Sequence, residues 1–143
     1  MKSVHLAFAG LAALTLAACA PNGVQITNGG SQALVTKNIT VARGQTVKVQ
    51  VFTSINPDCT ETPGTSGRME SEPAHGMATL SRTQDFVHFK SENPRSNCNS
   101  RRVPAWVVNY TAAADFVGED AFAFDEFFAA GGSLHFNVVV HAM

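Results

Sequence analysis

Apolar and polar residues alternate along most of the chain beyond residue 32, which is the pattern of half-buried β-strands. In the clearest run, 47–51, three valines alternate with a lysine and a glutamine. Shorter or longer runs of the same kind occur at 39–41, 76–80, 86–89, 104–110, 122–124 and 134–140. These seven runs, separated by turn residues, predict an all-β domain over residues 32–143, a β-sandwich or a small barrel.

Two segments interrupt the alternation and are predicted to be long loops. Residues 54–71 are rich in Pro, Gly, Ser and Thr, and residues 91–102 contain Asn, Pro and two adjacent arginines. Each segment contains one cysteine, Cys59 or Cys98. Because long loops on a rigid scaffold commonly carry binding function, we expect a recognition surface near these two cysteines.

The beginning of the chain follows a different pattern. Lys2 precedes an uncharged apolar run over residues 6–18, and Cys19 follows that run. The run is shorter than the roughly 20 apolar residues that a membrane-spanning helix needs. A basic start, a short apolar run and small residues at its end are typical of a secretory signal peptide.

The end of this run, Leu16-Ala17-Ala18-Cys19, resembles the lipobox of bacterial lipoproteins. The resemblance implies a signal peptide at residues 1–18 and acylation of Cys19. Each buried acyl methylene contributes about 0.8 kcal/mol to membrane binding, so two or three chains would anchor the protein firmly. Ala20, in place of the Asp that retains some lipoproteins at the inner membrane, implies the outer membrane. A plain signal peptide cut elsewhere is the alternative.

Residues 19–31 contain little apolar surface and are predicted to be a flexible tether. Once Cys19 carries lipid, Cys59 and Cys98 form an even pair in an oxidising compartment, where disulfides persist. We therefore predict a Cys59–Cys98 disulfide, with two unpaired buried thiols as the alternative. A disulfide that closes a loop of about 40 residues would stabilise the folded state by about 4 kcal/mol, because it lowers the entropy of the unfolded chain.

The segment from Val108 to Phe124 resembles the bacterial Ig-like and cadherin-like repeat domains, and residues 72–78 resemble a strand start of the same domains. The resemblance implies a Greek-key β-sandwich of about seven strands. Within it, Phe116 would close one end of the sandwich, and Gly118 would take a positive φ. Asp120 would accept backbone N–H bonds, and Tyr110 would lock a Greek-key connection.

Two acidic pairs, Glu119-Asp120 and Asp125-Glu126, are interpreted as solvated charge beside a turn. Calcium needs 6 to 8 oxygens around one point, and the calcium-binding runs of cadherin-like domains are missing from this sequence, so a calcium site is a minor alternative. His135 and His141 would lie about 20 Å apart on one strand, too far for one metal. We predict no metal and no cofactor, although a pairing of His75 or His88 with one of them stays open.

The charge balance disfavours a nucleic-acid partner, because 10 Lys and Arg stand against 11 Asp and Glu. The strongest cationic cluster is Arg95, Arg101 and Arg102, a candidate binding surface for a carboxylate or an anionic sugar. Trp106 nearby belongs to the core or, alternatively, to that surface. The loop that begins at Phe127 and Phe128 would form an apolar patch if both rings were exposed.

Motifs for nucleophilic, metal-dependent or nucleotide-dependent catalysis are missing from the sequence, so we predict no catalytic residue and regard an enzyme as a third possibility. The sequence predicts a lipid-anchored protein of the bacterial envelope that serves as a non-catalytic binding or structural module. Its partner would be an envelope protein or a glycan. The alternative is a small periplasmic inhibitor lipoprotein that acts on a lysozyme or a protease through a protruding loop.

Overall fold

The computed structural model describes residues 24–29 and 32–143. The predicted signal peptide, 1–18, and the predicted lipidation site, Cys19, lie outside the described residues. Within the described part, no helix combines the length and the apolar character that a membrane crossing requires.

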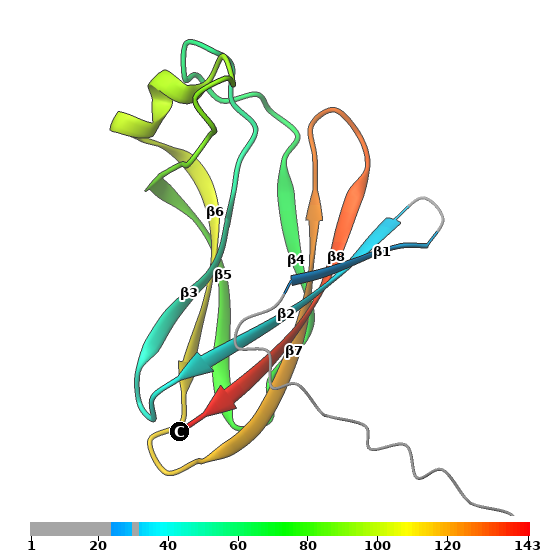
Figure 1. Ribbon diagram of the computed structural model, residues 1–143, viewed down its shortest axis with the longest axis vertical. Helices are drawn as coiled ribbons and strands as arrows, with labels where there is room; N and C mark the ends of the chain where they lie inside the picture. Colours follow the sequence, from blue (N-terminus) through cyan, green and yellow to red (C-terminus); the bar gives the residue numbers. More distant parts are fainter. Residues whose placement is uncertain (1–23, 30–31) are drawn as a thin grey trace, which may run out of the picture.

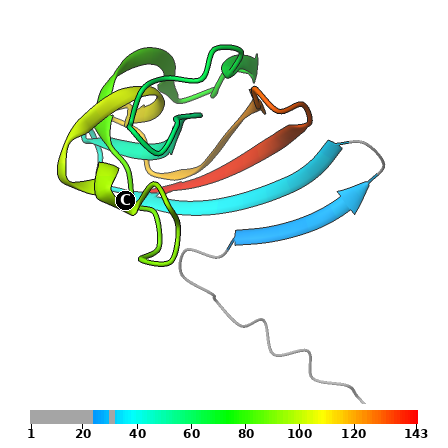
Figure 2. The ribbon, with the colours of Figure 1, turned by 90° about the horizontal axis from the view of Figure 1, so that it is seen from above.

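The described chain forms eight strands and one short 3-10 helix. In chain order these are β1 (Val24–Gly29), β2 (Gln32–Val41), β3 (Thr46–Phe52), β4 (Ser66–Ser71), β5 (Gly76–Phe86), η1 (Ser96–Ser100), β6 (Arg102–Ala112), β7 (Gly118–Phe127) and β8 (Ser133–Ala142). The strands form a five-stranded sheet, β1-β2-β8-β7-β4, and a three-stranded sheet, β3-β6-β5. The two sheets face each other in Figures 1 and 2, which confirms the predicted all-β sandwich.

The strand order is that of a Greek-key sandwich. If β2 to β8 are lettered A to G, then B, E and D pair in one sheet, and C, F and G pair in the other, as in Ig-type sandwiches. Strand A pairs in parallel with G, whereas the other neighbours are antiparallel. Strand β1 adds one further edge strand beside β2.

This order separates the connections into two groups. The β3–β4, β5–β6 and β7–β8 connections lie at one end, which we call the loop end. The β2–β3, β4–β5 and β6–β7 connections, none longer than five residues, lie at the opposite end, which we call the turn end, beside the C-terminus in Figure 1. The sandwich therefore presents two surfaces, built from different connections, at the ends of its long axis.

Aromatic side chains fill the space between the sheets. Tyr110 stacks on Phe122 at 5.7 Å between ring centroids, Phe122 lies 6.3 Å from Phe124, and Phe124 lies 4.6 Å from Phe136. Such pairs contribute packing energy beyond their buried area. The apolar residues that the alternation places inside β6, β7 and β8 are buried or packed against the core, but Val103, Ala105, Val107 and Ala123, on the other faces of β6 and β7, are buried as well.

Trp106 joins the same core. Its ring stacks on Phe52 with centroids 6.5 Å apart, and its indole N–H donates to the Thr65 carbonyl at 3.0 Å. The side chain is half-buried and packs against the core cluster. The core interpretation of Trp106 is therefore correct.

Three predictions about segments are wrong. Strand β4 lies inside the segment 54–71, which was predicted to be a loop. The pattern of apolar residues did not reveal this strand, because Met69 is its one large apolar residue. The run 86–89 is no separate strand: Phe86 ends β5, and the following residues belong to a loop. Residues 24–29 form β1 instead of part of a flexible tether, since pairing with β2 satisfies their backbone groups.

Asp120 joins three segments at the turn end. Its carboxylate is 4% exposed and accepts the backbone N–H groups of Ala74, His75 and Ala121 at 2.8, 3.0 and 3.0 Å. The Tyr110 hydroxyl donates to the same carboxylate at 2.8 Å. Burial alone would raise the pKa of Asp120, but these four hydrogen bonds outweigh it and lower the pKa. The predicted acceptor role is correct, although two of the donors come from the β4–β5 turn.

The neighbouring turn residues also follow the prediction in part. Gly118 has a φ of +143°, and a Cβ there would lie 3.2 Å from the Phe116 ring. Phe116 stacks face to face on His75 at 3.9 Å and closes the turn end. Tyr110 bonds to a side chain, whereas the hydroxyl of a tyrosine corner bonds to the backbone, so Tyr110 ties β6 to β7 in a different way.

The interior also contains a charged pair. Glu126 on β7 is 2% exposed, and its Oε1 atom has no hydrogen-bond partner. Lys37 on β2 donates to the Val49 carbonyl and, at 3.3 Å, to the Gln50 amide oxygen. Burial raises the pKa of Glu126 to about 7, although Gln50 and the Lys37 charge act in the opposite direction. Burial likewise lowers the pKa of Lys37.

The acidic pairs are therefore not simply solvated charge. Asp120, Asp125 and Glu126 are buried, and of the four residues only Glu119 is exposed. Alternation along β7 directs Asp120 and Glu126 into the sandwich and Asp125 to the outer face. Their oxygens consequently do not converge on one point.

Replacing Asp120 by Asn should lower the free energy of unfolding at pH 7 by about 2–4 kcal/mol, because backbone donors lose a charged acceptor. The folded-state pKa of Asp120 is lowered, so its ionised carboxylate contributes to the free energy of unfolding above the pKa of the unfolded chain. This contribution is lost as the pH falls through the folded-state pKa. Urea unfolding at neutral pH and in acid should show the deficit shrinking in acid. Asp115→Asn, at an exposed position, is the matched control. A deficit equal to that of the control would contradict the role assigned to Asp120.

Replacing Glu126 by Gln should stabilise the protein by about 2–3 kcal/mol at alkaline pH, because the amide needs no ionisation in the core. The folded-state pKa of about 7 exceeds the ordinary glutamate value of 4.5. The stability that the protonated Glu126 contributes is therefore fully present below pH 4.5 and is lost as the pH rises through about 7. Urea unfolding across this window should show the two proteins converging at its acid end. The exposed Glu72→Gln is the control, and a constant difference across the window would refute the assignment.

Candidate functional site at the loop end

Three loops from both sheets meet at the loop end (Figure 1). They are the β3–β4 loop at 53–65, the β5–β6 loop at 87–101 and the β7–β8 turn at 128–132. In the lettering above these are the B–C, D–E and F–G connections, which an Ig-type strand order brings to one end. The fold therefore gathers segments that are far apart in the sequence.

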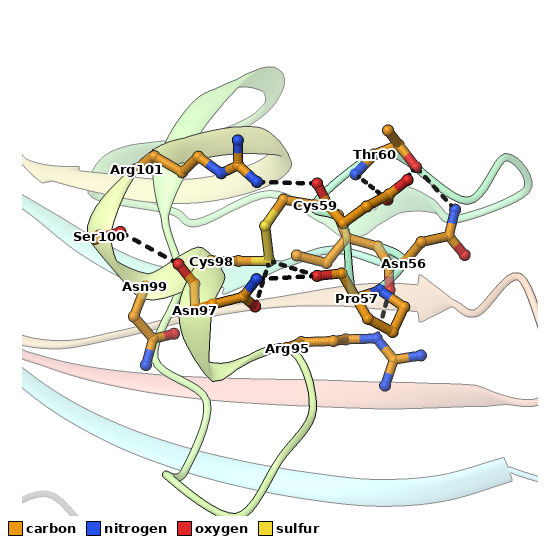
Figure 3. Close-up of a disulfide and its surroundings, with 12 residues drawn as sticks. Asn56, Pro57, Cys59, Thr60, Arg95, Asn97, Cys98, Asn99, Ser100 and Arg101 are labelled. Atoms are coloured by element: carbon orange, nitrogen blue, oxygen red, sulfur yellow. Dashed lines mark hydrogen bonds between the residues drawn. A yellow bond between two sulfur atoms is a disulfide. The ribbon is translucent and has the colours of Figure 1, made fainter.

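The Cys59–Cys98 disulfide joins the first two of these loops, as predicted, with 5.6 Å between the Cα atoms. Figure 3 shows Cys98 on η1 facing Cys59 in the β3–β4 loop. Cys59 has a positive φ of 71°, which is uncommon for a residue with a Cβ. Hydrogen bonds between Asn56 and the backbone of Cys59 and Thr60, each 2.8 Å, hold that tight turn.

The two loops are built around a small apolar core that is separate from the core of the sandwich. It consists of five buried residues with Phe89 packed against them: Ile55, Cys59, Val87, Cys98 and Val103. Asn99 adds a pair of hydrogen bonds to the backbone of Phe89, at 2.8 and 2.9 Å. The loop end is therefore a fixed surface.

The predicted arginine cluster has mainly structural contacts. Arg95 donates to the Ile55 carbonyl, and Arg101 donates to the Asp58 carbonyl at 2.9 Å (Figure 3). Arg102 lies along β5, where its guanidinium is 5.4 Å from the centroid of the Phe86 ring. The structure thus brings Arg95 and Arg101 to the disulfide-linked loops, while Arg102 contacts a different segment. Ligand binding by these side chains stays a prediction.

Two cavities open at this end. One, of about 240 Å³, is lined by all three loops, with Thr62, Phe89, Arg95 and Ala130 among its walls. The other, of about 290 Å³, also touches Thr53 and Phe89 and is lined by the ends of β3 and β5 and the start of the β5–β6 loop. Both are smaller than most small-molecule sites. Their size suits a side chain or a sugar ring of a larger partner.

The sequence analysis missed the contribution of the β7–β8 turn to this surface. Ala129 and Ala130 line the cavity, but alanines carry no chemical signal in a sequence. Phe127 and Phe128 are half-buried, so the patch that two exposed rings would have formed is not present. The Arg68 guanidinium covers Phe127, at 5.6 Å from its ring centroid.

Asp58 projects from the tip of the β3–β4 loop. Its carboxylate accepts the Thr60 hydroxyl at 2.6 Å and the Thr60 backbone N–H at 3.0 Å. These two bonds lower the pKa of Asp58, so the carboxylate is ionised at neutral pH. The loop tip therefore offers a fixed negative charge to solvent.

A second polar network crosses the outer face of the five-stranded sheet. Asp125 accepts hydrogen bonds from His135 at 2.7 Å, Arg68 at 3.1 Å and Gln32 at 3.3 Å. Arg68 also pairs with Glu70. The hydrogen-bond partner of the His135 ring is the Asp125 carboxylate, and no hydroxyl or thiol group is bonded to this ring in the described residues. We interpret this network as a structural brace across β2, β8, β7 and β4.

The histidines lie apart. His135 and His141 share the outer face of β8, opposite Asp125 and Glu119 of β7, whereas His75 is at the turn end and His88 is at the loop end. Within residues 24–29 and 32–143, no three His, Cys, Asp or Glu side chains come close enough to hold a metal ion.

Comparisons with known proteins add little to this picture. No protein-family model matches the sequence, and no curated protein matches it. Among solved structures, the solution structure of amebosin is similar, with 15% identity and a TM-score of 0.44. The match covers 80% of this chain and 100% of that one.

Replacing both Cys59 and Cys98 by Ala should lower the free energy of unfolding by about 4 kcal/mol, because the open chain regains loop entropy. The effect should be local as well as global. Amide hydrogen exchange should accelerate most at 55–60 and 96–101, whereas β6 to β8 should keep their protection. Uniform acceleration through the sheets would show instead that the disulfide supports the whole sandwich.

Proposed function

We propose that this protein is a lipid-anchored lipoprotein of the bacterial envelope whose β-sandwich is a non-catalytic binding module. The loop end would hold a protein or glycan partner of the envelope. One observation carries the proposal: three loops from both sheets form one surface that a disulfide and a separate apolar cluster hold fixed. Fixed loops support binding because less conformational freedom is lost when the partner docks.

The chemistry of the surface supports a macromolecular partner. Phe89 and the alanines of the β7–β8 turn give the smaller cavity apolar walls, and Arg95 adds a polar group. Around it, Asp58 and Arg101 are exposed charges of opposite sign. An apolar recess with a polar rim is the usual anatomy of a protein interface, and it also suits a sugar ring.

The anchor is supported by the sequence. The lipobox-like residues end at Cys19, and β1 begins five residues later, at Val24. A lipid on Cys19 would thus hold the sandwich close to the membrane surface. The proposed location is the outer membrane of a bacterial envelope.

A second function, inhibition of a lysozyme or a protease, is favoured by Asp58. The hydrogen bonds from Thr60 fix this carboxylate at the tip of a loop, and the neighbouring disulfide restrains the loop. An inhibitor places such a preformed charge in the cleft of an enzyme. This function uses the same loop end but commits it to a secreted hydrolase.

A photo-cross-linking residue in place of the exposed Ala130 should form an adduct with one envelope component in cells of the source organism. The same residue in place of Thr79, on the outer face of the three-stranded sheet, is the matched control. With the purified partner, Arg101→Ala should weaken binding by about tenfold, the cost of losing an interface arginine. Intact mass, with and without reduction, should first confirm a lipidated chain that begins at residue 19.

The outcomes separate the functions. Equal labelling from positions 130 and 79 would refute recognition at the loop end. An adduct with a secreted lysozyme or protease, together with inhibition that Asp58→Ala abolishes, would establish the inhibitor function. An adduct with a structural envelope protein or with glycan would establish the binding module.

A further inference from the structure

We propose that the turn end of the sandwich rests on the lipid bilayer, with Met77 and Val117 among the zwitterionic headgroups. The loop end would then point away from the membrane. This inference rests on the proposed anchor at Cys19, and it adds the face of the domain that contacts lipid.

The length of chain between the anchor and the domain limits the geometry. Val24 is five residue steps after Cys19, and a fully extended chain of that length spans at most about 18 Å. Val24 pairs with Lys37, four residues before the end of β2 at Val41. At about 3.3 Å per residue, the turn end lies roughly 13 Å from the level of Val24. The acylated residue can therefore reach the plane of the turn end and hardly beyond it.

The direction of β1 selects this end. The strand runs from Val24, at the middle of β2, to Gly29, at the level of Gln32. Gln32 pairs with Ser133, which directly follows the β7–β8 turn of the loop end. The start of β1 is consequently the end of this strand that lies nearer the turn end along β2. In Figure 1 the strand runs across the long axis of the molecule, with its start on the side of the C-terminus. To bring the loop end onto a membrane, the chain would have to reverse at Val24 and also clear the disulfide-linked loops.

The turn end carries exposed apolar side chains. Met77 is 59% exposed and Val117 is 60% exposed. Met77 lines an open hollow of about 500 Å³ whose other wall includes Phe116, the residue directly before Val117. His75, Thr111 and Asp115 also line the hollow, so Met77 and Val117 are two separate exposed apolar side chains at this end. Single apolar side chains of this kind match the shallow depth that interfacial residues reach in a bilayer.

The loop end has a different surface. Its tip presents Asp58, Asn97 and Arg101 to solvent. Phe86, the large apolar residue exposed nearest to it, is 42% exposed and is covered by the Arg102 guanidinium. Charged side chains are exposed at both ends, so desolvation alone does not choose between them. The turn end is distinguished by the exposed Met77 and Val117 and by its place on the side where β1 begins.

The charges around the turn end define the kind of lipid. Arg43 is exposed there beside three exposed carboxylates, those of Glu72, Asp115 and Glu119. An anionic membrane surface would repel this balance of charge. We therefore expect contact with zwitterionic headgroups, such as phosphatidylethanolamine.

The test uses the full lipidated chain in vesicles of phosphatidylethanolamine and phosphatidylcholine with brominated acyl chains. Trp106, the one tryptophan of the chain, is replaced by Phe, and a reporter is introduced as Val117→Trp. Phe86→Trp in the same background is the matched control. We expect the brominated lipid to quench Val117→Trp several-fold more strongly than Phe86→Trp. Equal quenching, or stronger quenching of Phe86→Trp, would overturn the proposed orientation.

A second measurement avoids the reporter. Amide hydrogen exchange of the wild-type chain on vesicles should be slower at 74–77 and 113–118 than in the soluble Cys19→Ala chain, and unchanged at 56–60. Slowing at 56–60 alone would place the loop end on the membrane and overturn the inference. The anchor is tested separately, because a wild-type chain without acyl mass or vesicle binding would refute the lipoprotein proposal itself.

Discussion

Every part of this fold depends on the packing of two inner sheet faces against each other. The faces meet through rings on three strands, Tyr110 on β6, Phe122 and Phe124 on β7, and Phe136 on β8, together with the valines around them. Aromatic and branched side chains supply most of the area that folding removes from water. The positions of the loops follow from this packing, because each connection begins and ends where an inward-facing strand leaves the core.

The same packing explains what the sequence could predict. Strands β3, β6 and β8 lie between or beside other strands and alternate large apolar residues with polar ones, so the period of two is visible. Strand β4 and strand β1 are the edges of the larger sheet, and β3 is an edge of the smaller one. Strand β3 was visible because its valines alternate, whereas β4 has one large apolar residue, Met69. The backbone hydrogen bonds that hold such a strand leave no record in composition. The disulfide was predictable because it needs two cysteines and an oxidising compartment.

The polar residues show where sequence reasoning ends. Asp120 and Asp125 stand in a segment that reads as solvated, yet each is buried among donors from distant parts of the chain. The donors to Asp120 lie 45 and 46 residues earlier, and the Arg68 guanidinium that pairs with Asp125 lies 57 residues earlier. Likewise, Arg95 and Arg101 look like free cations in the sequence, although both bond to carbonyls of a loop about 40 residues away. Partners at such separations become visible only after the strand order is known.

The pairing of β1 with β2 also has a mechanical consequence. Its antiparallel ladder joins six residue pairs, and β2 is joined in turn to β8 by a parallel ladder of ten pairs. A pull on the start of β1, directed along the strand, loads the hydrogen bonds of the first ladder together in shear. Separation in that geometry requires many bonds to break at once, whereas peeling from an end breaks them one at a time. The short edge strand is thus built to resist a force that is applied to its first residue along the direction of the strand.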